Sequence, residues 1–346
     1  MMKMKTLFTT LIIFLNVLTS CGKGGDTPAP VETAPSNLIL NATVSADNTG
    51  NVTFKASATN GSVYIFDLGN GVNNIVSTTG EISYKYSTTG IYTVTVVAKN
   101  ASGKSTISKS ADVNVTVVLS LVWSDEFDVP GAPNANKWGY DLGAGGWGNN
   151  ELQYYTNRSD NAFVSGGTLK IVAKKEAYEG SQYTSARLLS KGKYSFKYGK
   201  VEARAKLPAG VGTWPAIWML GDNINEVKWP ACGEIDIMEH VGKSLNTIYG
   251  TLHYPARYGG NADGKTTVIN NVTTEFHKYG MEWNESNIKF YVDDVLFFTF
   301  TNSSSVPFNQ NFFLILNSAL GGNFGGPLDP AYTSAVFEID YVRVYQ

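Results

Sequence analysis

The chain has 346 residues, of which 43% are hydrophobic and 16% are charged, a balance that excludes disorder over the whole length. A formal net charge of −2 gives no field that would attract nucleic acid or an anionic membrane surface. The 35 glycines, 19 tyrosines and 7 tryptophans are typical of an all-β protein that faces a polar ligand such as a sugar.

Residues 1–20 begin with lysines and continue as an apolar run that is too short for a transmembrane span. The run lies where a secretory signal belongs. Small residues precede Cys21, and Leu18-Thr19-Ser20-Cys21 resembles a bacterial lipobox. The resemblance implies cleavage before Cys21, lipidation of its thiol and export to a bacterial cell envelope. We expect the outer membrane, at the cell surface or the periplasmic face. An ordinary signal peptide with an incidental cysteine is the alternative.

Residues 21–35 are rich in glycine, proline, threonine and alanine, which predicts a flexible or extended linker between the membrane and the folded part. Cys232 is the only other cysteine in the chain. If Cys21 is lipidated, Cys232 therefore has no disulfide partner within the chain. We therefore predict that Cys232 is a small, buried packing residue.

Residues 36–118 alternate apolar and polar side chains in short runs separated by turn clusters, without helical periodicity. This pattern predicts a small immunoglobulin-like β-sandwich. The segments 64–71 and 84–94 resemble a PKD domain, although the first departs from the usual motif by reading Phe-Asp-Leu-Gly-Asn-Gly. The resemblance implies a spacer or, alternatively, a weak glycan-contacting module. No catalytic constellation is present in this segment.

Residues 121–346 contain all seven tryptophans and continue the strand pattern to the end of the chain. Residues 201–207 alternate apolar and charged side chains, as a half-buried antiparallel strand does. Asp293-Asp294 lies between two apolar runs and predicts a hairpin. A stretch of this length and texture predicts one large β-sandwich.

Three carboxylates lie in the apolar run Gly-Glu-Ile-Asp-Ile-Met-Glu-His at 233–240. Glu234 and Asp236 are two residues apart and therefore project from the same face of a strand. Strict alternation would place Glu239 on the other face. One extra residue, a β-bulge near Ile237-Met238, would return Glu239 to the face of the other two acids.

Clustered acids repel one another, so their pKa values separate. Glycoside hydrolysis uses this separation, because one carboxylate attacks while another donates a proton. Four strand steps span roughly 13 Å, whereas retaining enzymes hold their carboxyl groups about 5–5.5 Å apart. The spacing alone therefore also allows the acids to lie on a solvated strand face, with Ile235 and Ile237 in the core.

The run at 233–240 resembles the Glu-x-Asp-x-x-Glu signature of glycoside hydrolase family 16, in its bulge-containing, laminarinase-like form. The rest of 121–346 agrees in the segments 123–128, 146–156, 187–192, 212–220 and 250–255. The resemblance implies a concanavalin-like jelly roll with a cleft on its concave face. It further implies retaining double displacement, with Glu234 as the nucleophile, Glu239 as the acid/base and Asp236 between them to tune the nucleophile.

Sugar binding needs flat apolar surfaces flanked by hydrogen-bonding groups. Trp214 and Trp218 share one strand face and are expected to form the floor of the cleft, with a core position as the alternative. Further positions match sugar-contacting residues of the family or serve structural roles, and His253 is either hydrogen-bonded near the acids or an ordinary strand histidine. These positions are Asn149, Glu151, Arg187, Trp229, His253, Trp283 and Asn317.

No metal or cofactor is expected for catalysis, because the chain has three histidines and no His-x-x-x-His pair. The family resemblance implies one structural Ca²⁺ away from the cleft. Its matching positions are Glu126, the backbone carbonyl of Gly167, and Asp340. A buried Asp340 in ordinary hydrogen bonds is the alternative.

The sequence thus predicts an endo-acting β-1,3-glucan hydrolase with tolerance of mixed β-1,3/1,4 linkages. A hydrolase of algal galactans such as agarose or carrageenan is one alternative. The loop at 147–155 and the lack of a Lys/Arg cluster for sulfate weigh against it. The other alternative is a non-catalytic glycan-binding lipoprotein, which would have no need of three repelling acids. Composition gives no reason to expect an oligomer, so a monomer with a polysaccharide substrate is predicted.

Overall fold

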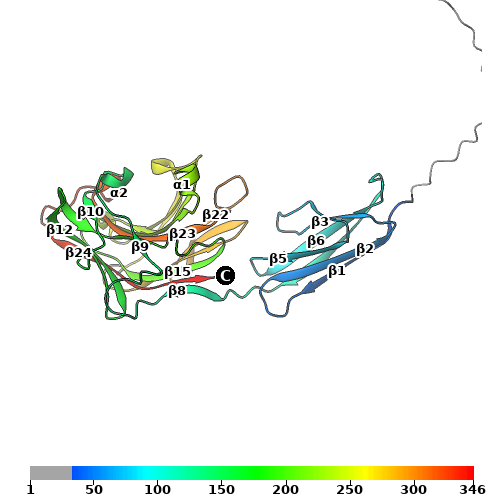
Figure 1. The fold of residues 1–346 in the computed structure, drawn as a ribbon, viewed down its shortest axis with the longest axis horizontal. Coiled ribbons are helices and arrows are strands. Elements are labelled where there is room, and N and C mark those ends of the chain that lie inside the picture. Colours follow the sequence, from blue (N-terminus) through cyan, green and yellow to red (C-terminus); the bar gives the residue numbers. More distant parts are fainter. Residues whose placement is uncertain (1–32) are drawn as a thin grey trace, which may run out of the picture.

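The computed structural model describes residues 33–346, so the signal segment, Cys21 and most of the linker lie outside the described residues. The described chain forms two β-sandwiches that follow one another in the sequence (Figure 1). None of its described helices has the length and apolar character needed to cross a bilayer. The predicted all-β class is confirmed.

The smaller, N-terminal sandwich packs a three-stranded sheet on a four-stranded one. Alternation puts Phe54 and Phe66 in its core, and the buried Tyr86 donates its hydroxyl to the carbonyl of Leu68 at 2.9 Å. Its strands are β1 (Ser36–Val44), β2 (Asn51–Thr59), β3 (Val63–Asp67), β4 (Ile75–Ser77), β5 (Glu81–Lys85), β6 (Gly90–Lys99) and β7 (Thr106–Val115).

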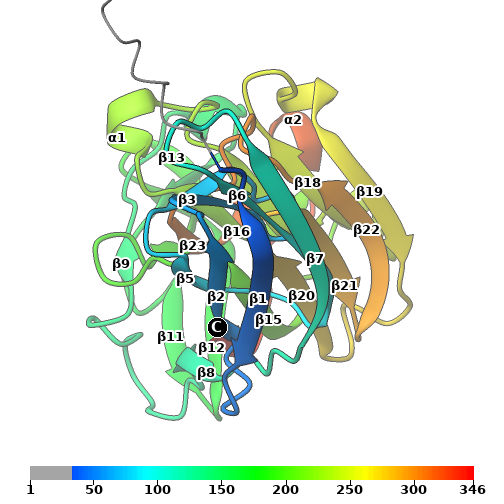
Figure 2. The same ribbon diagram turned by 90° about the vertical axis from the view of Figure 1, so that its right-hand side faces the viewer.

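The connection between the two sandwiches is short and makes backbone hydrogen bonds to both. The N–H of Val118 donates to the carbonyl of Asn48 at 2.8 Å, while Ser120 and Gln346 exchange two bonds of 2.9 and 3.0 Å. Figure 2, turned to face the right-hand side of Figure 1, shows the blue and cyan N-terminal sandwich in front of the larger one.

The larger sandwich consists of a seven-stranded and a ten-stranded sheet, with strand orders β19-β18-β17-β16-β23-β14-β9 and β10-β13-β12-β24-β15-β20-β21-β22. In the second sheet, β11 also pairs with β12 and β8 with β24. The strands are β8 (Leu121–Asp125), β9 (Gly139–Tyr140), β10 (Gln153–Tyr155), β11 (Ala162–Ser165), β12 (Thr168–Tyr178), β13 (Ser181–Ser185), β14 (Arg187–Leu189), β15 (Gly199–Lys206), β16 (Thr213–Gly221), β17 (Glu234–His240), β18 (Thr247–His253), β19 (Asp263–Val268), β20 (His277–Trp283), β21 (Asn287–Val292), β22 (Val295–Thr301), β23 (Phe312–Leu320) and β24 (Ser334–Tyr345).

The helices of this domain are all short and lie in its loops: η1 (Gly146–Gly148), α1 (Ile224–Val227), η2 (Gly242–Ser244), η3 (Gly259–Asn261) and α2 (Gly322–Gly325). Two of them, α1 and α2, stand above the ends of the seven-stranded sheet, on opposite sides of its concave face (Figure 1). The predicted hairpin at Asp293-Asp294 is confirmed between β21 and β22, with φ of 48° and 65° at its two residues.

The core lies between the two sheets and follows from alternation along each strand. On β15, Val201, Ala203 and Ala205 are fully buried, while the charged residues between them turn outward, except that Glu202 is itself largely covered. Cys232 is buried and free, as predicted. Because the core takes one face of the seven-stranded sheet, the opposite, concave face is left to the side chains of the site.

Candidate active site

Strand β17 carries the three acids at the middle of the concave sheet, between β16 and β18. Its pairing with β18 shifts between Asp236 and Glu239, and its pairing with β16 shifts at the same place. The predicted β-bulge at Ile237-Met238 is therefore confirmed. Both bulge residues are buried in the core, so the strand regains the register that puts Glu239 beside Asp236.

The three acids differ in how far they are buried. The side chain of Glu234 is 17% exposed, whereas Asp236 and Glu239 are 3% and 8% exposed. Ile235 and Ile237 lie on the opposite, core side of the strand. The acids thus do not lie on an open, solvated strand face, and Glu234 is the one that an incoming ligand meets most readily.

Both oxygens of Glu239 accept hydrogen bonds from the neighbouring strands. The indole N–H of Trp214 on β16 donates to Oε1 at 2.9 Å. The hydroxyl of Thr251 on β18 donates to Oε2 at 3.2 Å. Glu239 is therefore held from both sides, so its position depends on the orientation of Trp214 and Thr251.

His253 at the end of β18 faces the other two acids. Its Nε2 lies 3.2 Å from Oδ2 of Asp236 and 3.6 Å from Oε1 of Glu234. Its Nδ1 accepts the backbone N–H of Gly259 at 3.0 Å, so the proton of the neutral imidazole resides on Nε2. Of the two interpretations of His253, the structure supports the position beside the acids.

Burial raises the pKa of all three acids, and repulsion by neighbouring carboxylates adds to this for Glu234 and Asp236. Burial, followed by the charge of Asp236, raises the pKa of Glu234 to about 8. The pKa of Asp236 lies well above its ordinary value, because Asp236 is the most deeply buried and faces Glu239. Asp236 is therefore the acid that keeps its proton. Once Asp236 is neutral, its charge no longer adds to the effect of burial on the pKa of Glu234, and Glu234 is the first of these two acids to ionise.

This pKa shift predicts that replacing Glu234 by glutamine stabilises the fold at neutral pH. Below its unfolded pKa of 4.5, Glu234 is protonated in both the folded and the unfolded chain and does not change the free energy of unfolding. As the pH rises from 4.5 toward the folded pKa of about 8, the unfolded chain ionises more readily, so Glu234 lowers the free energy of unfolding. Since one pKa unit corresponds to about 1.4 kcal/mol, we expect Glu234→Gln to gain a few kcal/mol in the free energy of unfolding at pH 7.5. The gain should vanish at pH 4. Urea denaturation at both pH values measures it, and an equal gain at both would contradict the explanation.

Trp218, which was predicted to form part of the floor of the cleft, lies beside Arg187. Trp218 donates its indole N–H to Oδ1 of Asn317 at 2.7 Å. The guanidinium of Arg187 lies 4.7 Å from the centre of the Trp218 ring and 5.0 Å from that of Trp147, and its Nε pairs with Asp141 at 3.0 Å. The two indole rings attract the guanidinium of Arg187 through cation–π interactions and so help to fix its position.

Glu151 lies in a second polar network next to Trp218 and Arg187. It accepts hydrogen bonds from Asn149 at 3.3 Å, from Gln153 at 2.6 Å and from the hydroxyl of Tyr155 at 3.1 Å. Tyr155 also accepts the amide of Asn317 at 2.9 Å, which connects this network to Trp218. The structure therefore brings together the predicted residues Asn149, Glu151, Arg187, Trp218 and Asn317.

Two other predicted tryptophans have different outcomes. Trp229 is 43% exposed and packs against His253 and Tyr258, with ring centres 6.0 and 5.4 Å away, so it lies at the rim beside the acids. The prediction that Trp283 lines the cleft is wrong. Trp283 is 2% exposed on β20 of the other sheet and donates its indole N–H to the carbonyl of Phe308 at 2.9 Å.

Sequence reasoning missed the residues that hold the predicted ones in place: Asp141, Trp147, Tyr155, Tyr249, Thr251, Tyr258, Gly259 and Phe324. Most of them reach the site from loops or neighbouring strands, where no alternation pattern applies. Thr251 could have been found, because it lies two residues before His253 and so shares its strand face.

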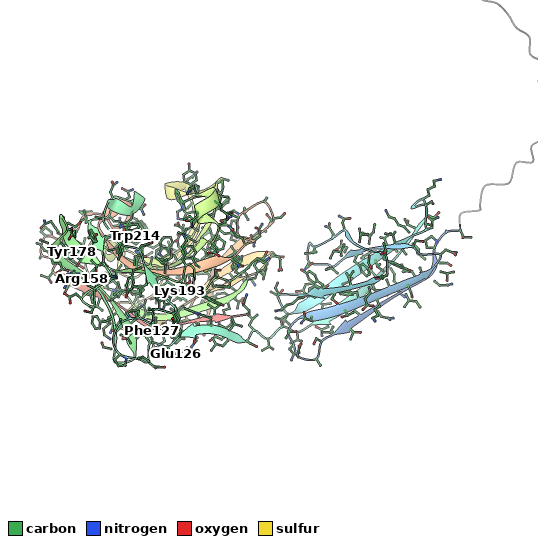
Figure 3. The ribbon with its side chains drawn as sticks, in the orientation of Figure 1. Glu126, Phe127, Arg158, Tyr178, Lys193 and Trp214 are labelled. Atoms are coloured by element: carbon green, nitrogen blue, oxygen red, sulfur yellow. The ribbon has the colours of Figure 1, made fainter. Side chains whose placement is uncertain are left out.

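The side chains expected at a calcium site each have an arginine partner. Glu126 accepts two hydrogen bonds from Arg343, at 3.0 and 2.8 Å, and Asp340 accepts one from Arg204 at 2.5 Å. In Figure 3, Glu126 lies at the lower edge of the domain, far from Trp214 on the concave side. As placed, the two carboxylates do not fit a shared cation. Calcium at Glu126, Gly167 and Asp340 stays a prediction, which thermal melts with Ca²⁺ and with EDTA check.

Within residues 33–346, one group of His, Asp and Glu side chains has its ligand atoms within 4.8 Å of one another, and this group is Glu234, Asp236 and His253. The Nε2 of His253 carries the proton of the imidazole, because Nδ1 accepts a hydrogen bond from Gly259. His253 therefore faces the acids with a proton donor. The cluster is thus better suited to proton handling than to holding an ion.

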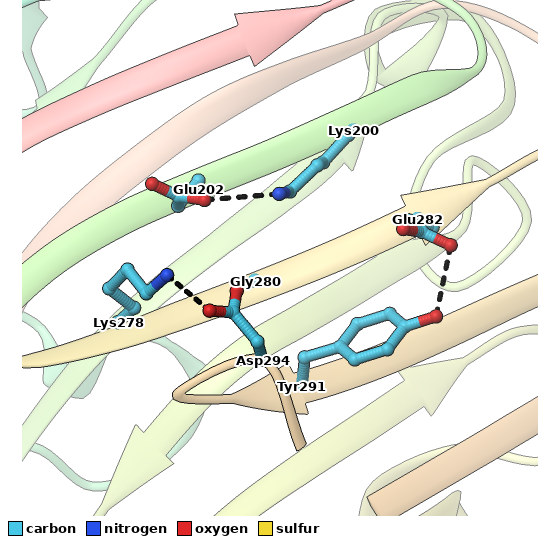
Figure 4. Close-up of a pocket in the computed structure, with 7 residues that line it drawn as sticks. All are labelled: Lys200, Glu202, Lys278, Gly280, Glu282, Tyr291 and Asp294. Carbon is cyan, nitrogen blue, oxygen red and sulfur yellow. Dashed lines mark hydrogen bonds and ion pairs between the residues drawn. The ribbon is translucent and has the colours of Figure 1, made fainter. Parts of the chain in front are cut away.

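A separate hollow on the outer sheet has polar walls whose groups pair with one another. Lys200 pairs with Glu202 at 3.1 Å, Lys278 with Asp294 at 2.5 Å, and Tyr291 donates to Glu282 at 2.9 Å (Figure 4). Gly280 also lines this hollow. Each acid named here is paired with a lysine or a tyrosine hydroxyl. This hollow therefore lacks a cluster of buried acids with raised pKa values such as the one on the concave face.

A β-sandwich whose concave sheet carries three carboxyl groups on one strand, among aromatic side chains, has the acids that a glycoside hydrolase uses. The family model of glycosyl hydrolases family 16 matches residues 149–343, and that of the PKD domain matches residues 37–117. The chain belongs to glycosyl hydrolases family 16, and its N-terminal sandwich is a PKD domain.

The relatives agree with this assignment. A β-glucanase from Rhodothermus marinus is 48% identical over 242 residues, covering 65% of this chain and 85% of that protein. A glucan endo-1,3-β-glucosidase from Cryptopygus antarcticus is 38% identical over 248 residues, covering 64% of this chain and 90% of that protein. The X-ray structure of the laminarinase from Rhodothermus marinus matches with a TM-score of 0.65 and 47% identity, over 66% of this chain and 98% of that one.

Proposed function

We propose that this enzyme hydrolyses internal β-1,3 linkages of a laminarin-type glucan by retaining double displacement. The observation that carries the proposal is the bulged strand β17, which turns Glu234, Asp236 and Glu239 toward one another on the concave sheet. The names of the laminarinase from Rhodothermus marinus and the endo-1,3-β-glucosidase from Cryptopygus antarcticus support the choice of linkage.

In the first step, Glu239 donates its proton to the glycosidic oxygen while Glu234 attacks the anomeric carbon. The proton is available because burial raises the pKa of Glu239. Glu234 is the attacking group because it is the most exposed of the three and ionises while the more deeply buried Asp236 keeps its proton. In this mechanism the protonated Asp236, on the same strand face as Glu234, donates a hydrogen bond to the carboxylate and orients the nucleophile.

In the second step, Glu239, now ionised, removes a proton from a water molecule, which attacks the anomeric carbon of the glycosyl-enzyme. Hydrogen bonds from Trp214 and Thr251 stabilise the negative charge that Glu239 carries at this stage. The leaving carboxylate of Glu234 recovers the hydrogen bond of Asp236. The configuration at the anomeric carbon is retained.

The test is reducing-end release by a soluble chain that lacks residues 1–21, assayed in parallel on laminarin, lichenan, agarose and carrageenan. We expect oligosaccharides from laminarin and a lower rate on lichenan. Cleavage of only the galactans would keep the mechanism and contradict the linkage. Binding to one polymer without cleavage would favour the glycan-binding alternative.

We also propose that the enzyme is exported and held on the outer membrane by a lipidated Cys21, with the PKD domain as a spacer. The lipobox-like segment supports this proposal, and two or more acyl chains are needed for stable anchoring. Fractionation of cells that produce the full chain or its Cys21→Ser variant tests it. Release of both into the soluble fraction, or membrane retention of both, would contradict lipidation at Cys21. The predicted monomer is checked by light scattering of the soluble chain.

A further inference from the structure

Phe324, in the glycine-rich loop around α2, has no role in the steps above, yet its ring lies between two aromatic side chains next to Glu239. Its ring centre is 5.5 Å from that of Trp214, at an interplanar angle of 86°. It is 4.9 Å from that of Tyr249, at 81°. Tyr249 lies directly opposite Glu239 in the pairing of β17 with β18. Both contacts are edge-to-face, the arrangement that aromatic pairs prefer.

The loop that carries Phe324 is held by neighbours on two sides. The ammonium of Lys243 donates to the carbonyl of Phe324 at 2.6 Å and lies 5.8 Å from the centre of its ring. The N–H of Asn323 donates to the carbonyl of Asn149 at 2.7 Å. The backbone around α2 is thus connected both to the loop after the catalytic strand and to the loop that carries Glu151.

Glycine at 322 allows this loop to approach the cleft closely. Gly322 has a φ of 75°, and a Cβ there would lie 2.8 Å from the carbonyl of Asn149 and 3.4 Å from Cζ3 of Trp214. A Cβ at Gly325 would likewise lie 3.4 Å from Cβ of Trp214. The α2 loop therefore packs directly on Trp214.

Trp214 in turn determines where one oxygen of Glu239 lies, because its indole N–H donates to Oε1. An indole that lost its packing partner could rotate about its side-chain bonds and take this hydrogen bond away. We propose that Phe324 is a positioning residue for Glu239, acting through Trp214. This inference rests on the proposed function, in which Glu239 is the acid/base.

The expected effect has a definite sign. The hydrogen bond from Trp214 lowers the pKa that burial raises at Glu239. Losing that bond raises the pKa of Glu239 further and moves its proton away from the glycosidic oxygen. Proton transfer then becomes slower although the acid is still protonated, and misplacement by about 1 Å can cost on the order of 10²-fold in rate.

The experiment compares Phe324→Ala with the unaltered enzyme on two substrates, laminarin and a 2,4-dinitrophenyl β-laminaribioside. On laminarin, kcat/KM should fall about 10- to 100-fold, and the alkaline limb of its pH profile should move to higher pH. On the aryl substrate kcat/KM should change less than about threefold, because dinitrophenolate leaves without a proton and so needs no acid.

Two variants serve as controls. Phe324→Tyr keeps the ring and should restore the rate and the pH profile. Asn323 lies in the same loop as Phe324, and its side-chain oxygen accepts a hydrogen bond from Asn150. Asn323→Ala removes only this bond and should leave the alkaline limb of the pH profile in place. Should Phe324→Ala not fold, Lys243→Met keeps the aromatic ring but removes the hydrogen bond to the carbonyl of Phe324 and the cation near the ring. A smaller shift in the same direction is then expected.

Equal losses on both substrates, or a raised KM with an unchanged pH profile, would show that Phe324 contacts the sugar or merely supports the fold. Either result overturns the positioning role. A different outcome tests the proposed function itself: if the unaltered enzyme does not cleave laminarin, or Glu239→Ala cleaves it normally, then Glu239 is not the acid/base. The two failures are thus distinguished by the unaltered enzyme and the Glu239 variant.

Discussion

Replacing Glu234 with glutamine is expected to lower kcat/KM for laminarin by at least about 10³-fold. An amide has nearly the shape of the carboxylate, but it carries no charge and does not form the glycosyl-enzyme bond. Asp236 cannot substitute for it, because Asp236 is only 3% exposed, whereas the side chain of Glu234 is 17% exposed. Initial rates of reducing-end release over a range of laminarin concentrations measure the effect.

The matched control for this variant is Glu282→Gln. It makes the same chemical change on the outer sheet, where Glu282 accepts the hydroxyl of Tyr291 at 2.9 Å. Its activity should equal that of the unaltered enzyme. A Glu234→Gln enzyme that keeps more than a tenth of the activity would mean that another group attacks the anomeric carbon.

The stability and activity predictions for Glu234→Gln have the same physical origin. The carboxyl is buried beside another acid, which destabilises the fold at neutral pH and at the same time makes the group reactive. A variant that is more stable and inactive is therefore the expected result. A variant that is both inactive and destabilised would point to a structural role for Glu234.

Alternation along the strands was enough to predict the larger sandwich, but it left two possibilities for the acids of β17. A single extra residue at Ile237-Met238 puts all three on one face, and the family resemblance favoured this bulge over a solvated strand face. The match of Trp283 to a cleft position of the family was wrong. Tryptophan suits a sugar cleft and a core equally well. The sequence does not tell whether β20 belongs to the concave sheet or to the other sheet, nor which face of β20 packs in the core.

The contacts around the acids could not be predicted from the run 233–240 alone. His253 has its Nε2 beside Asp236 because its Nδ1 accepts an N–H from Gly259, a bond that forms only once the loop after β18 has folded back. Phe324 reaches Trp214 from a loop after β23, far along the chain. Side-chain direction in loops depends on tertiary packing, for which sequence periodicity gives no signal.

Five residue steps separate Glu234 from Glu239 along the chain, and the bulge reduces them to four steps of the partner strand, from His253 to Tyr249. The bulge removes one step from the pairing, because Asp236 and Glu239 pair with Thr251 and Tyr249, which are only two residues apart. His253 completes the group from the neighbouring strand. The pairing thus shortens the separation of Asp236 and Glu239 within the sheet from three steps to two.

Replacing Glu239 with alanine is expected to lower kcat/KM for laminarin by about 10²- to 10⁴-fold, since the glycosidic oxygen then leaves without a proton. On 2,4-dinitrophenyl β-laminaribioside kcat/KM should be almost unchanged, because this leaving group needs no acid. The alkaline limb that reports the pKa of Glu239 should disappear from the profile of the variant. Stopped-flow release of dinitrophenolate and the reducing-end assay measure the two rates.

Azide separates the roles of the two glutamates. In Glu239→Ala the glycosyl-enzyme still forms, and azide attacks it without needing a base, so kcat on the aryl substrate should rise and the product should be the β-glycosyl azide. In Glu234→Ala azide takes the place of the missing nucleophile and should give the α-anomer. Proton NMR of the anomeric centre distinguishes the products. An α-azide from Glu239→Ala would exchange the assignments, placing the nucleophile at the residue that Trp214 and Thr251 hold and the acid at the more exposed Glu234.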